Sequence, residues 1–301
     1  MPTAQLDQAS QPQQERLAYI EFRLLFIGCI NRSDLVHRFG LTESAASRDL
    51  ALYRQIASPN IGYDTVHRTY RLGARAKPLF NYNPAQALIA LTEGFGDDFV
   101  AQSAPWLPAE QPSRRRAPSI QVLMPICRAL FSGKAINIRY GSLSKGFEQR
   151  TIVPLTLVDD GLKWLLRAFE NDSYIDLALN RIAAVSPAKT IANAKKLREQ
   201  DSEWHQRIEL ELVPHPSLTH PEVIELEYGM KDGVLQVQLQ AALAGYLLSR
   251  WNVDCTTDHH LQGPKYQLWL RNSGALQQAE QLPKLALAPG SSAAVIMQAN
   301  G

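Results

Sequence analysis

Apolar residues recur every three or four positions over residues 15–30 of the chain. They are Leu17, Ile20, Leu24 and Ile27. This spacing predicts an amphipathic helix that packs one face into a core. A shorter helix is predicted over 33–39, and Gly40 behind it supplies the positive φ angle at which helices commonly end. The preceding residues 1–14, rich in Gln, Ser and Pro, are predicted to form a mobile arm.

A third helix is predicted from Thr42, a common N-cap residue, to about residue 57. At 100° per residue, its large apolar side chains share one face and its small, polar and basic side chains share the other. The first face has Ala46, Leu50, Tyr53 and Ala57, and the second has Ser44, Arg48, Ala51 and Gln55, with Ser47 at its edge. A DNA major groove is about 12 Å wide, so a helix that enters it needs short outward side chains. These helices therefore predict a helix-turn-helix.

Alternating residues over 61–72, with a turn at His67–Arg68, predict the two-stranded wing of a winged helix. Residues 32–77 hold eight basic and four acidic side chains, a local charge of +4 that suits the binding of DNA phosphates. The predicted DNA contacts are Arg32, Thr42, Ser44, Ala45, Ser47, Arg48, Arg68, Tyr70 and Arg71. Two alternatives stay open: a helical protein-interaction module without DNA contact, and a merely solvated role for Arg48.

The middle of the chain contains short alternating stretches separated by turns rich in Gly and Asp. They cover residues 135–140, 150–158, 162–169 and 173–182. Short strands with such turns predict a small, strongly curved β-sheet or barrel. Before them, residues 103–119 contain four prolines and three consecutive arginines, a composition that predicts an exposed linker.

The spacing of particular residues in this middle region resembles the WYL domain. The matching residues are Tyr140, Ser142 and Ser144, then Arg150 and Pro154, then Gly161, Trp164 and Arg167, and finally Asp176, Leu179, Arg181 and Ile182. The run for which the domain is named, Trp-Tyr-Leu, is here Trp164-Leu165-Leu166. The resemblance implies a Sm/SH3-like β-fold that senses a ligand, with a nucleotide or a nucleic-acid fragment as the candidate effector.

The amino-terminal region fits the same resemblance. Its matching residues are Gly28, Ile30, Arg32, Asp34 and Leu35, then Phe39-Gly40, then Ala46-Ser47-Arg48-Asp49-Leu50 and Tyr53, and finally Tyr63-Asp64. This order, which extends over about residues 15–280, resembles the CapW/BrxR-type repressors. These are WYL regulators encoded beside bacterial anti-phage systems such as CBASS and BREX. The resemblance implies a homodimeric repressor that binds double-stranded DNA at an inverted repeat and controls an anti-phage defence operon.

The side chains of the WYL-like region suit a nucleotide or an oligonucleotide. Aromatic faces stack on bases, arginine forks bind phosphates and hydroxyl groups donate hydrogen bonds. The predicted ligand contacts are Tyr140, Ser142, Ser144, Arg150, Trp164, Arg167 and Arg181. Along a strand Trp164 and Arg167 fall on opposite faces, so one of them lines the pocket while the other lies in the core. A second open alternative pairs Arg181 with Asp176 in an internal salt bridge.

The last region predicts a small α/β module. Strands are expected over 208–213, 234–240 and 266–270, and a helix over 241–251. The module resembles the C-terminal extension of WYL regulators, which implies that it dimerises the protein. The fold class expected is α+β multidomain. Its parts are a winged helix-turn-helix domain with its arm (1–85), a helical connector and linker (86–118), the WYL domain (119–190), the dimerisation domain (205–288) and a tail (289–301).

The overall composition narrows the function classes. Of the 301 residues, 45% are hydrophobic and 20% are charged, which is typical of a folded chain. The formal net charge is only +2, so a uniformly basic nucleic-acid coat is excluded. The longest apolar run, Leu24–Ile30, is too short to cross a bilayer, and the amino end has no hydrophobic signal core. We therefore expect a cytoplasmic protein without a membrane partner.

Motifs for catalysis or metal binding are sparse in the sequence. The three cysteines, Cys29, Cys127 and Cys255, lack CxxC spacing, which favours reduced, packed thiols over a disulfide or a zinc site. The histidines of the last region are expected in loops: His215, His220, His259 and His260. Since the sequence offers no P-loop, paired-carboxylate or Ser–His–Asp pattern beyond chance, we expect neither an enzyme nor a cofactor or metal. Remaining alternatives are a transcriptional activator and a single-stranded nucleic-acid sensor that uses the same WYL pocket.

Overall fold

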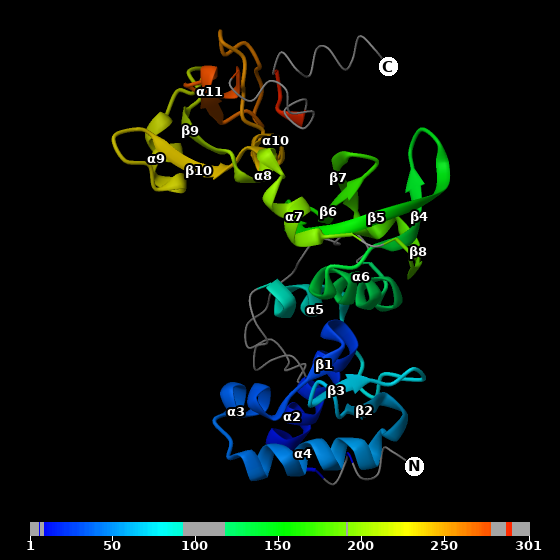
Figure 1. The fold of residues 1–301 in the computed structure, drawn as a ribbon. Helices are drawn as coiled ribbons and strands as arrows, with labels where there is room; N and C mark the ends of the chain where they lie inside the picture. Colours follow the sequence, from blue (N-terminus) through cyan, green and yellow to red (C-terminus); the bar gives the residue numbers. More distant parts are fainter. Residues whose placement is uncertain (1–5, 7–8, 93–117, 191, 278–286, 291–301) are drawn as a thin grey trace. The chain divides into compact units, whose positions relative to one another are not determined.

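The computed structural model describes residues 6, 9–92, 118–190, 192–277 and 287–290 (Figure 1). The chain divides into two compact units. One consists of residues 1–158 with 163–194, and the other of residues 159–162 with 195–301. The winged-helix and WYL-like regions therefore share one unit, and the C-terminal region forms the second. Most of the predicted linker over 103–119 lies outside the described residues.

The amino-terminal part of the first unit combines helices with a three-stranded sheet. Its helices are α2 (Gln11–Phe22), the π-helix η1 (Arg23–Ile27), α3 (Arg32–Phe39), α4 (Glu43–Ile56) and the short 3-10 helix η2 (Ser58–Asn60). Its strands are β1 (Cys29–Ile30), β2 (Ile61–Asp64) and β3 (Thr69–Leu72), antiparallel in the order β1-β3-β2. The predicted helix-turn-helix and wing are confirmed.

The first helix differs from its prediction at both ends. It begins at Gln11 rather than near Glu15, because Pro12 fits the first turn of a helix, where its missing N–H costs no hydrogen bond. Residues 11–14 of the predicted arm therefore belong to α2, and residues 1–5 and 7–8 lie outside the described residues. The regular α-helix stops at Phe22, and the π-helix then continues to Gly28, whose φ of 95° ends it.

An apolar cluster beneath α4 holds the winged helix together. Its buried members include Leu17, Ile20, Leu24, Ile30, Leu35, Leu50, Ile56 and Ile61. The predicted inward face of α4 is confirmed, because all of its members are buried: Ala46, Leu50, Tyr53 and Ala57. The opposite face is open to solvent at Ser44, Arg48, Ala51 and Gln55.

The other part of the first unit is a five-stranded sheet with helices packed on it. The strands are β4 (Ile136–Ser142), β5 (Gly146–Asp159), β6 (Trp164–Glu170), β7 (Ser173–Ala178) and β8 (Ile182–Pro187), in the order β7-β6-β5-β4-β8. The 3-10 turn η4 (Leu179–Arg181) links β7 to β8, and the helices are α5 (Pro84–Thr92) and α6 (Ile120–Ser132). Figure 1 shows α6 lying along the sheet. This arrangement confirms the small β-fold expected for the middle region.

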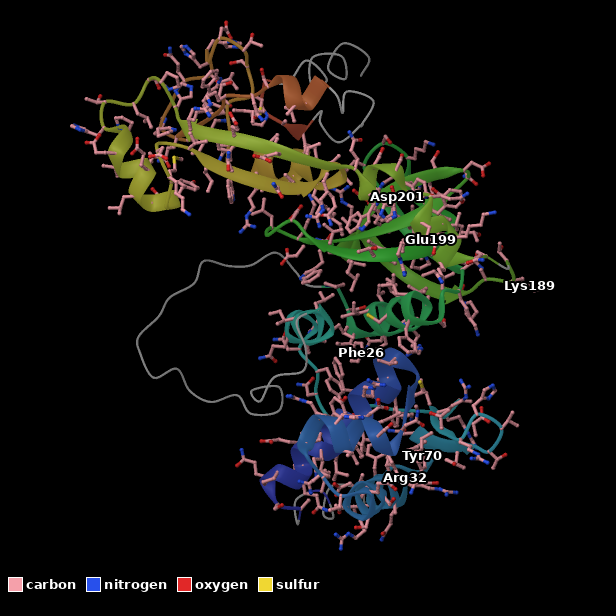
Figure 2. The ribbon with its side chains drawn as sticks, turned by 60° about the vertical axis from the view of Figure 1, so that its left-hand side comes forward. Phe26, Arg32, Tyr70, Lys189, Glu199 and Asp201 are labelled. Atoms are coloured by element: carbon pink, nitrogen blue, oxygen red, sulfur yellow. The ribbon has the colours of Figure 1, made fainter. Side chains whose placement is uncertain are left out.

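One apolar cluster runs from this sheet into the winged helix. Leu123 and Ile126 of α6 belong to it, as do Phe22, Leu25 and Phe26 from the first helix. Figure 2 labels Phe26, which is fully buried, where the end of that helix meets α5 and α6. The helix that supports α4 is thus packed directly on the helix that covers the sheet.

The second unit contains the predicted α/β module. Its helices are α7 (Ala194–Glu199), α8 (Ser202–His205), α9 (Pro221–Tyr228), α10 (Ala241–Arg250) and α11 (Gly274–Gln277). Its strands are β9 (Arg207–Pro214), β10 (Leu235–Gln240) and β11 (Leu268–Leu270), antiparallel in the order β10-β9-β11. In both units, every helix of the described residues is too short or too polar to span a bilayer.

Candidate nucleic-acid interface and effector pocket

Polar contacts fix the position of α4. The Thr42 hydroxyl caps the helix by accepting a 3.3 Å hydrogen bond from the backbone N–H of Ala45. On the side that faces α2, buried Asp49 forms a 2.6 Å ion pair with Arg16 and accepts a 3.2 Å hydrogen bond from Gln13. Gln13 and Arg16 of α2 therefore anchor one face of α4, and the opposite face is exposed to solvent at Ser44 and Arg48.

The exposed face of α4 carries small polar groups and one arginine. Ser44 and Arg48 are exposed, and Ala45 is half-buried beside them. The Ser47 hydroxyl donates a 2.8 Å hydrogen bond to the carbonyl of Glu43, so its oxygen remains an acceptor for an outside partner. The geometry therefore matches the predicted outward face, with short side chains around a single long cation.

Two predicted phosphate contacts meet next to this face. Arg32, at the start of α3, and Arg68, at the tip of the wing, line a polar hollow of about 270 Å³ together with Asn31, Ser33 and Glu43. The hollow lies at the amino ends of α3 and α4, where the helix dipoles favour an anion, and the Glu43 carboxylate is its one acidic lining group in the described part of the chain. Arg68 has a φ of 50°, a turn conformation that brings the wing tip to this place. The sequence predicted both arginines as DNA contacts, but it did not predict that they line the same hollow.

The wing turn is held by Asp64. One carboxylate oxygen accepts hydrogen bonds from the backbone N–H groups of Val66 and His67, both at 3.0 Å, and the other binds the His67 ring at 2.8 Å and Arg71 at 2.7 Å. These hydrogen bonds, that from the His67 backbone first, hold the pKa of Asp64 well below its ordinary value. Tyr70 and Arg71, the last two predicted DNA contacts, lie on opposite faces of β3. Tyr70 packs toward the helices, whereas Arg71 faces the other way.

Glu21 is a structural residue that sequence analysis missed. It is fully buried and accepts hydrogen bonds from the hydroxyl groups of Tyr53 and Tyr82, at 2.8 and 3.1 Å. Burial raises the pKa of its carboxyl group, against the lowering effect of the hydrogen bonds it accepts. The signal was present in the sequence, because an acidic residue within an apolar helical stretch needs buried partners.

In the WYL-like sheet, two of the predicted ligand residues lie together. Tyr140 is buried, and the Arg150 guanidinium lies 5.6 Å from the centre of its ring. Arg150 also forms a two-pronged pair with the Glu170 carboxylate through Nε, at 2.9 Å, and a terminal nitrogen. The arginine fork is thus turned toward a carboxylate of its own chain.

Trp164 and Arg167 lie on opposite faces of β6, as the alternation along a strand predicts. Trp164 is half-buried and packs against the core cluster below α6, whereas Arg167 lies on the other face and is almost fully buried. Arg167 pairs with Asp176 at 3.3 Å, and the exposed fractions of the two side chains are 1% and 4%. The structure therefore gives Asp176 a different partner from Arg181, and the alternative pairing of Asp176 with Arg181 is wrong.

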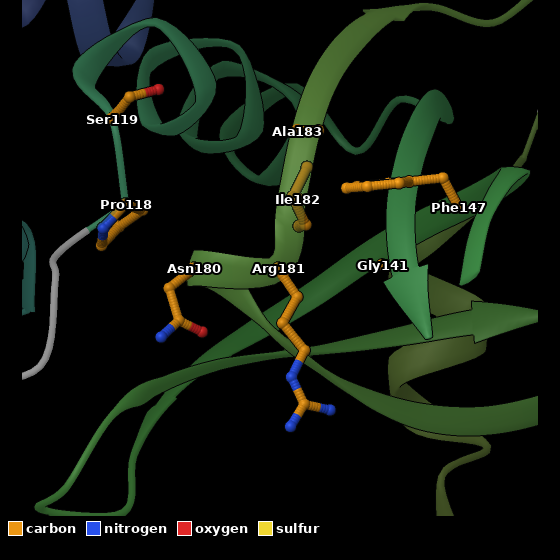
Figure 3. Close-up of a pocket in the computed structure, with 8 residues that line it drawn as sticks. All are labelled: Pro118, Ser119, Gly141, Phe147, Asn180, Arg181, Ile182 and Ala183. Atoms are coloured by element: carbon orange, nitrogen blue, oxygen red, sulfur yellow. The ribbon is translucent and has the colours of Figure 1, made fainter. Parts of the chain in front are cut away.

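Arg181 instead lines a hollow on the surface of the sheet. The cavity has a volume of about 420 Å³ and is lined by Pro118, Ser119, Gly141, Phe147, Asn180, Arg181, Ile182 and Ala183. Figure 3 shows Asn180 and Arg181 projecting from the η4 turn and the Phe147 ring reaching toward Ile182. Ser142 and Ser144 lie nearby in the β4–β5 turn, with their hydroxyl oxygens 3.2 Å apart. The predicted ligand residues thus fall into separate groups, and only Arg181 lines this cavity.

The second unit holds a polar chain that the sequence did not predict. The buried His215 ring contacts Ser217 Oγ at 2.7 Å and Asp254 Oδ2 at 3.3 Å. Asp254 also accepts hydrogen bonds from both the backbone and the hydroxyl of Thr256, so its carboxylate is engaged in holding the loop. Among the described residues, no three His, Cys, Asp or Glu side chains are arranged to hold a metal ion.

Family comparisons agree with this order of domains. The chain matches the BrxR transcriptional regulator winged helix-turn-helix domain over residues 12–93, the WYL domain over 121–187 and the BrxR transcriptional regulator C-terminal dimerization domain over 207–276. The fold and the site thus define a WYL-domain regulator of the BrxR type.

The individual relatives specify the family more closely. The chain is 32% identical over 275 residues to the DNA-binding transcriptional repressor CapW of Escherichia coli (strain KTE188), covering 86% of this chain and 89% of the relative. The CapW repressors of Pseudomonas aeruginosa and Stenotrophomonas maltophilia are each 31% identical, covering 86% and 80% of this chain and 89% and 84% of theirs. The protein belongs to the CapW family.

One solved structure is also similar to this chain. It is the proteasome accessory factor B/C (PafBC) of Arthrobacter aurescens, which is 14% identical with a TM-score of 0.26 and is aligned over 88% of this chain and 47% of its own. A likeness at this level carries no argument about the site.

Proposed function

We propose that the protein is a homodimeric DNA-binding transcriptional repressor. The observation that carries the proposal is the exposed face of α4, where Arg48 projects among small side chains beside the hollow lined by Arg32 and Arg68. The names of the CapW relatives and the BrxR-type domains at both ends of the chain support the same function.

In this proposal α4 enters the major groove. Ser44, Ala45, Ser47 and Arg48 face the bases, with the Arg48 fork suited to a guanine edge. Thr42, at the start of the helix, lies beside the sugar–phosphate backbone of the DNA. Arg32 and Arg68 hold a phosphate in the hollow between α3, α4 and the wing. The helix thus reads sequence while the two arginines fix its register.

A second copy completes the recognition. One recognition helix contacts only a few base pairs, and a dimer presents two of them related by a twofold axis. The match of residues 207–276 to a C-terminal dimerization domain supports this arrangement. The expected operator is therefore an inverted repeat.

The direct test is a fluorescence-anisotropy titration with duplex DNA from upstream of the protein's own gene. A scrambled duplex of equal length and each single strand serve as competitors. We expect the native duplex to bind most tightly and to give two protein chains per site. Equal affinity for the scrambled duplex would refute sequence-specific recognition, and preference for a single strand would favour the single-strand sensor. A promoter–reporter fusion separates repression from activation by the sign of the change.

We propose in addition that the WYL domain senses a nucleotide or an oligonucleotide. The cavity lined by Arg181 and Phe147 supports this role, because it offers a guanidinium for a phosphate and an aromatic ring for a base. Calorimetric titration with mononucleotides and short oligonucleotides tests it. The variant Arg181→Ala is expected to lose binding, whereas Arg207→Ala, at an exposed position of β9, is expected to keep it. Equal binding by both variants would exclude this cavity.

The regulated genes are proposed to belong to an anti-phage defence operon. This step rests on the resemblance to the CapW/BrxR-type repressors alone. Inspection of the neighbouring genes, followed by a phage challenge of cells with and without the regulator, tests it. An operon without any effect on phage infection would contradict this part of the proposal and leave the DNA-binding part intact.

A further inference from the structure

A cavity without an assigned role lies inside the first unit, between the winged helix and the sheet. Its volume is about 840 Å³, within the usual range for a small-molecule site. One wall comes from the end of η1, from β1 and from β3, and the other from α6, the start of β4 and the end of β8. It is distinct from the Arg181 cavity, with which it shares no lining residue.

The lining combines an apolar floor with cations. Its apolar side chains include Ile27, Met124, Pro125, Ala129, Phe131, Ile136 and Val185. Phe131 is 61% exposed, which is unusual for a ring of this size. Of the lining residues in the described part of the chain, three are cationic and none is acidic: the cations are Arg71, Arg128 and Lys134. The cavity is therefore amphipathic and positively charged.

Arg128 is the most buried of the three cations that line the cavity. Its guanidinium donates a hydrogen bond to the carbonyl of Leu25, which holds the side chain against the winged helix. Burial lowers its pKa from the ordinary value, yet no carboxylate of the described residues forms an ion pair with it. A partly desolvated cation gains strongly from an anionic partner. Lys134, an exposed residue just beyond α6, also forms no ion pair with a carboxylate of the described residues.

The backbone around the cavity is also irregular. Pro125 lies inside α6 and has no N–H, so the carbonyl of Gln121 loses its helical donor. On the other wall, the π-helix η1 ends at Gly28, where an added Cβ would lie 3.7 Å from Arg128 Cδ. Helices with such irregularities often mark ligand sites. Each wall of the cavity thus contains a departure from regular α-helical structure.

We propose that this cavity binds a small anionic amphiphile, a molecule with a single carboxylate, sulfonate or phosphate group on an apolar body. The anionic group lies between Arg71, Arg128 and Lys134, and the apolar body rests on Met124, Ile136 and Val185. The proposal goes beyond the repressor function, since it assigns a second effector site that the DNA contacts do not need.

The position of Arg71 couples this site to the wing. Arg71 lies opposite both Cys29 and Gly62 in the three-stranded sheet, and its Nε binds Asp64, the residue that holds the wing turn. An anion that draws Arg71 into the cavity weakens this pair. The wing tip with Arg68 then loses its fixed place beside α3. Occupancy of the cavity is therefore expected to lower the affinity for DNA.

The binding test uses decanoate as the anionic probe and decanol as its uncharged counterpart, followed by calorimetry on the full chain. Decanoate is expected to bind and decanol is not. Lys134→Glu reverses a charge at the cavity, and Pro187→Trp fills it from an exposed position of β8 opposite Ile136. Each is expected to weaken decanoate binding by about tenfold or more. The control, Lys145→Glu, alters an exposed lysine of the β4–β5 turn outside the cavity and is expected to change nothing.

The coupling test repeats the operator titration with and without decanoate. A loss of DNA affinity of about fivefold or more is expected for the wild type and not for Pro187→Trp. No decanoate binding, or equal binding by the cavity variants, would overturn the site; binding without any change in DNA affinity would overturn the coupling. The outcomes remain separable from the repressor proposal, because that is decided by the titration without decanoate.

Discussion

The hydroxyl of Tyr53 on α4 donates a 2.8 Å hydrogen bond to the carboxylate of Glu21 on α2, and both side chains are buried. The same carboxylate accepts hydrogen bonds from the backbone N–H groups of Leu79 and Phe80, both at 2.9 Å, and from the hydroxyl of Tyr82. One acidic side chain therefore joins the first helix, the proposed recognition helix and the segment that follows the wing. A network with this many donors orients α4 within the winged helix.

Removing this carboxylate is expected to destabilise the winged helix. Glu21→Ala leaves several buried N–H and O–H donors without their acceptor, and the free energy of unfolding should fall by about 3 kcal/mol or more. Glu21→Gln is the matched control, because its amide keeps one acceptor oxygen and its NH₂ group can donate to a tyrosine hydroxyl. Urea unfolding of both variants measures their free energies of unfolding, and we expect Glu21→Gln to be the more stable of the two. An Ala variant as stable as the Gln variant would mean that the network does not support the fold.

The raised pKa of Glu21 predicts a pH dependence of stability. A carboxyl group whose pKa is raised in the folded state holds its proton more tightly there than in the unfolded chain. Its contribution to stability is thus full below its ordinary pKa and is lost as the pH rises through the raised pKa. Wild type should therefore lose stability relative to Glu21→Gln as the pH increases through this window. Unfolding curves at a series of pH values measure the difference, and a relative gain for wild type would contradict the assignment.

Arg48 is expected to be the main base-reading side chain. Arg48→Ala should weaken binding to the native operator by about 1–3 kcal/mol while leaving binding to a scrambled duplex nearly unchanged. Arg54→Ala is a charge-matched control, since Arg54 is an exposed arginine in the last turn of the same helix. Anisotropy titrations at one salt concentration compare the three proteins. If both variants lose the same affinity for the native operator, Arg48 contributes only its positive charge and does not read a base.

Arg32 and Arg68 are expected to act on every DNA sequence alike. Each contacts a phosphate in our proposal, and replacing either by Ala should reduce the slope of log affinity against log salt by about 0.9. Arg75→Ala, at an exposed position beyond the wing, controls for the general loss of one positive charge. Titrations at several salt concentrations give the slopes. If Arg75→Ala changes the slope as much as the other two, the hollow does not hold a phosphate.

The sequence predicted best the features that depend on local periodicity. The inward face of α4 follows from spacing alone, and Ala46, Leu50 and Tyr53 are all buried as expected. The Thr42 cap is confirmed for the same reason, because a cap involves residues only three apart along the chain. The wing turn at Arg68 is likewise a local signal.

Long-range polar pairing was beyond the reach of the sequence pattern. Glu21 meets the backbone of Phe80, far along the chain, and Arg150 meets Glu170 on a neighbouring element. Neither spacing has a period that identifies it, since strand order decides which side chains meet. The same limit explains why Arg181 was grouped with Arg167, although the fold buries Arg167 and leaves Arg181 on the surface.

The buried pair of Arg167 and Asp176 offers a test of that difference in environment. Arg167→Met leaves a carboxylate buried without this partner, and Asp176→Leu does the same to the guanidinium, so each should lower the free energy of unfolding by about 3–5 kcal/mol. The double variant should lose clearly less than the sum, because no uncompensated charge remains. The exposed pair of Arg271 and Glu211, 2.9 Å apart, is the control cycle, with an expected coupling of about 0–1 kcal/mol. Urea unfolding of both cycles gives the coupling energies. Additive losses at the buried pair would show that other groups hold its charges. Arg167 would then again be a candidate for binding a ligand.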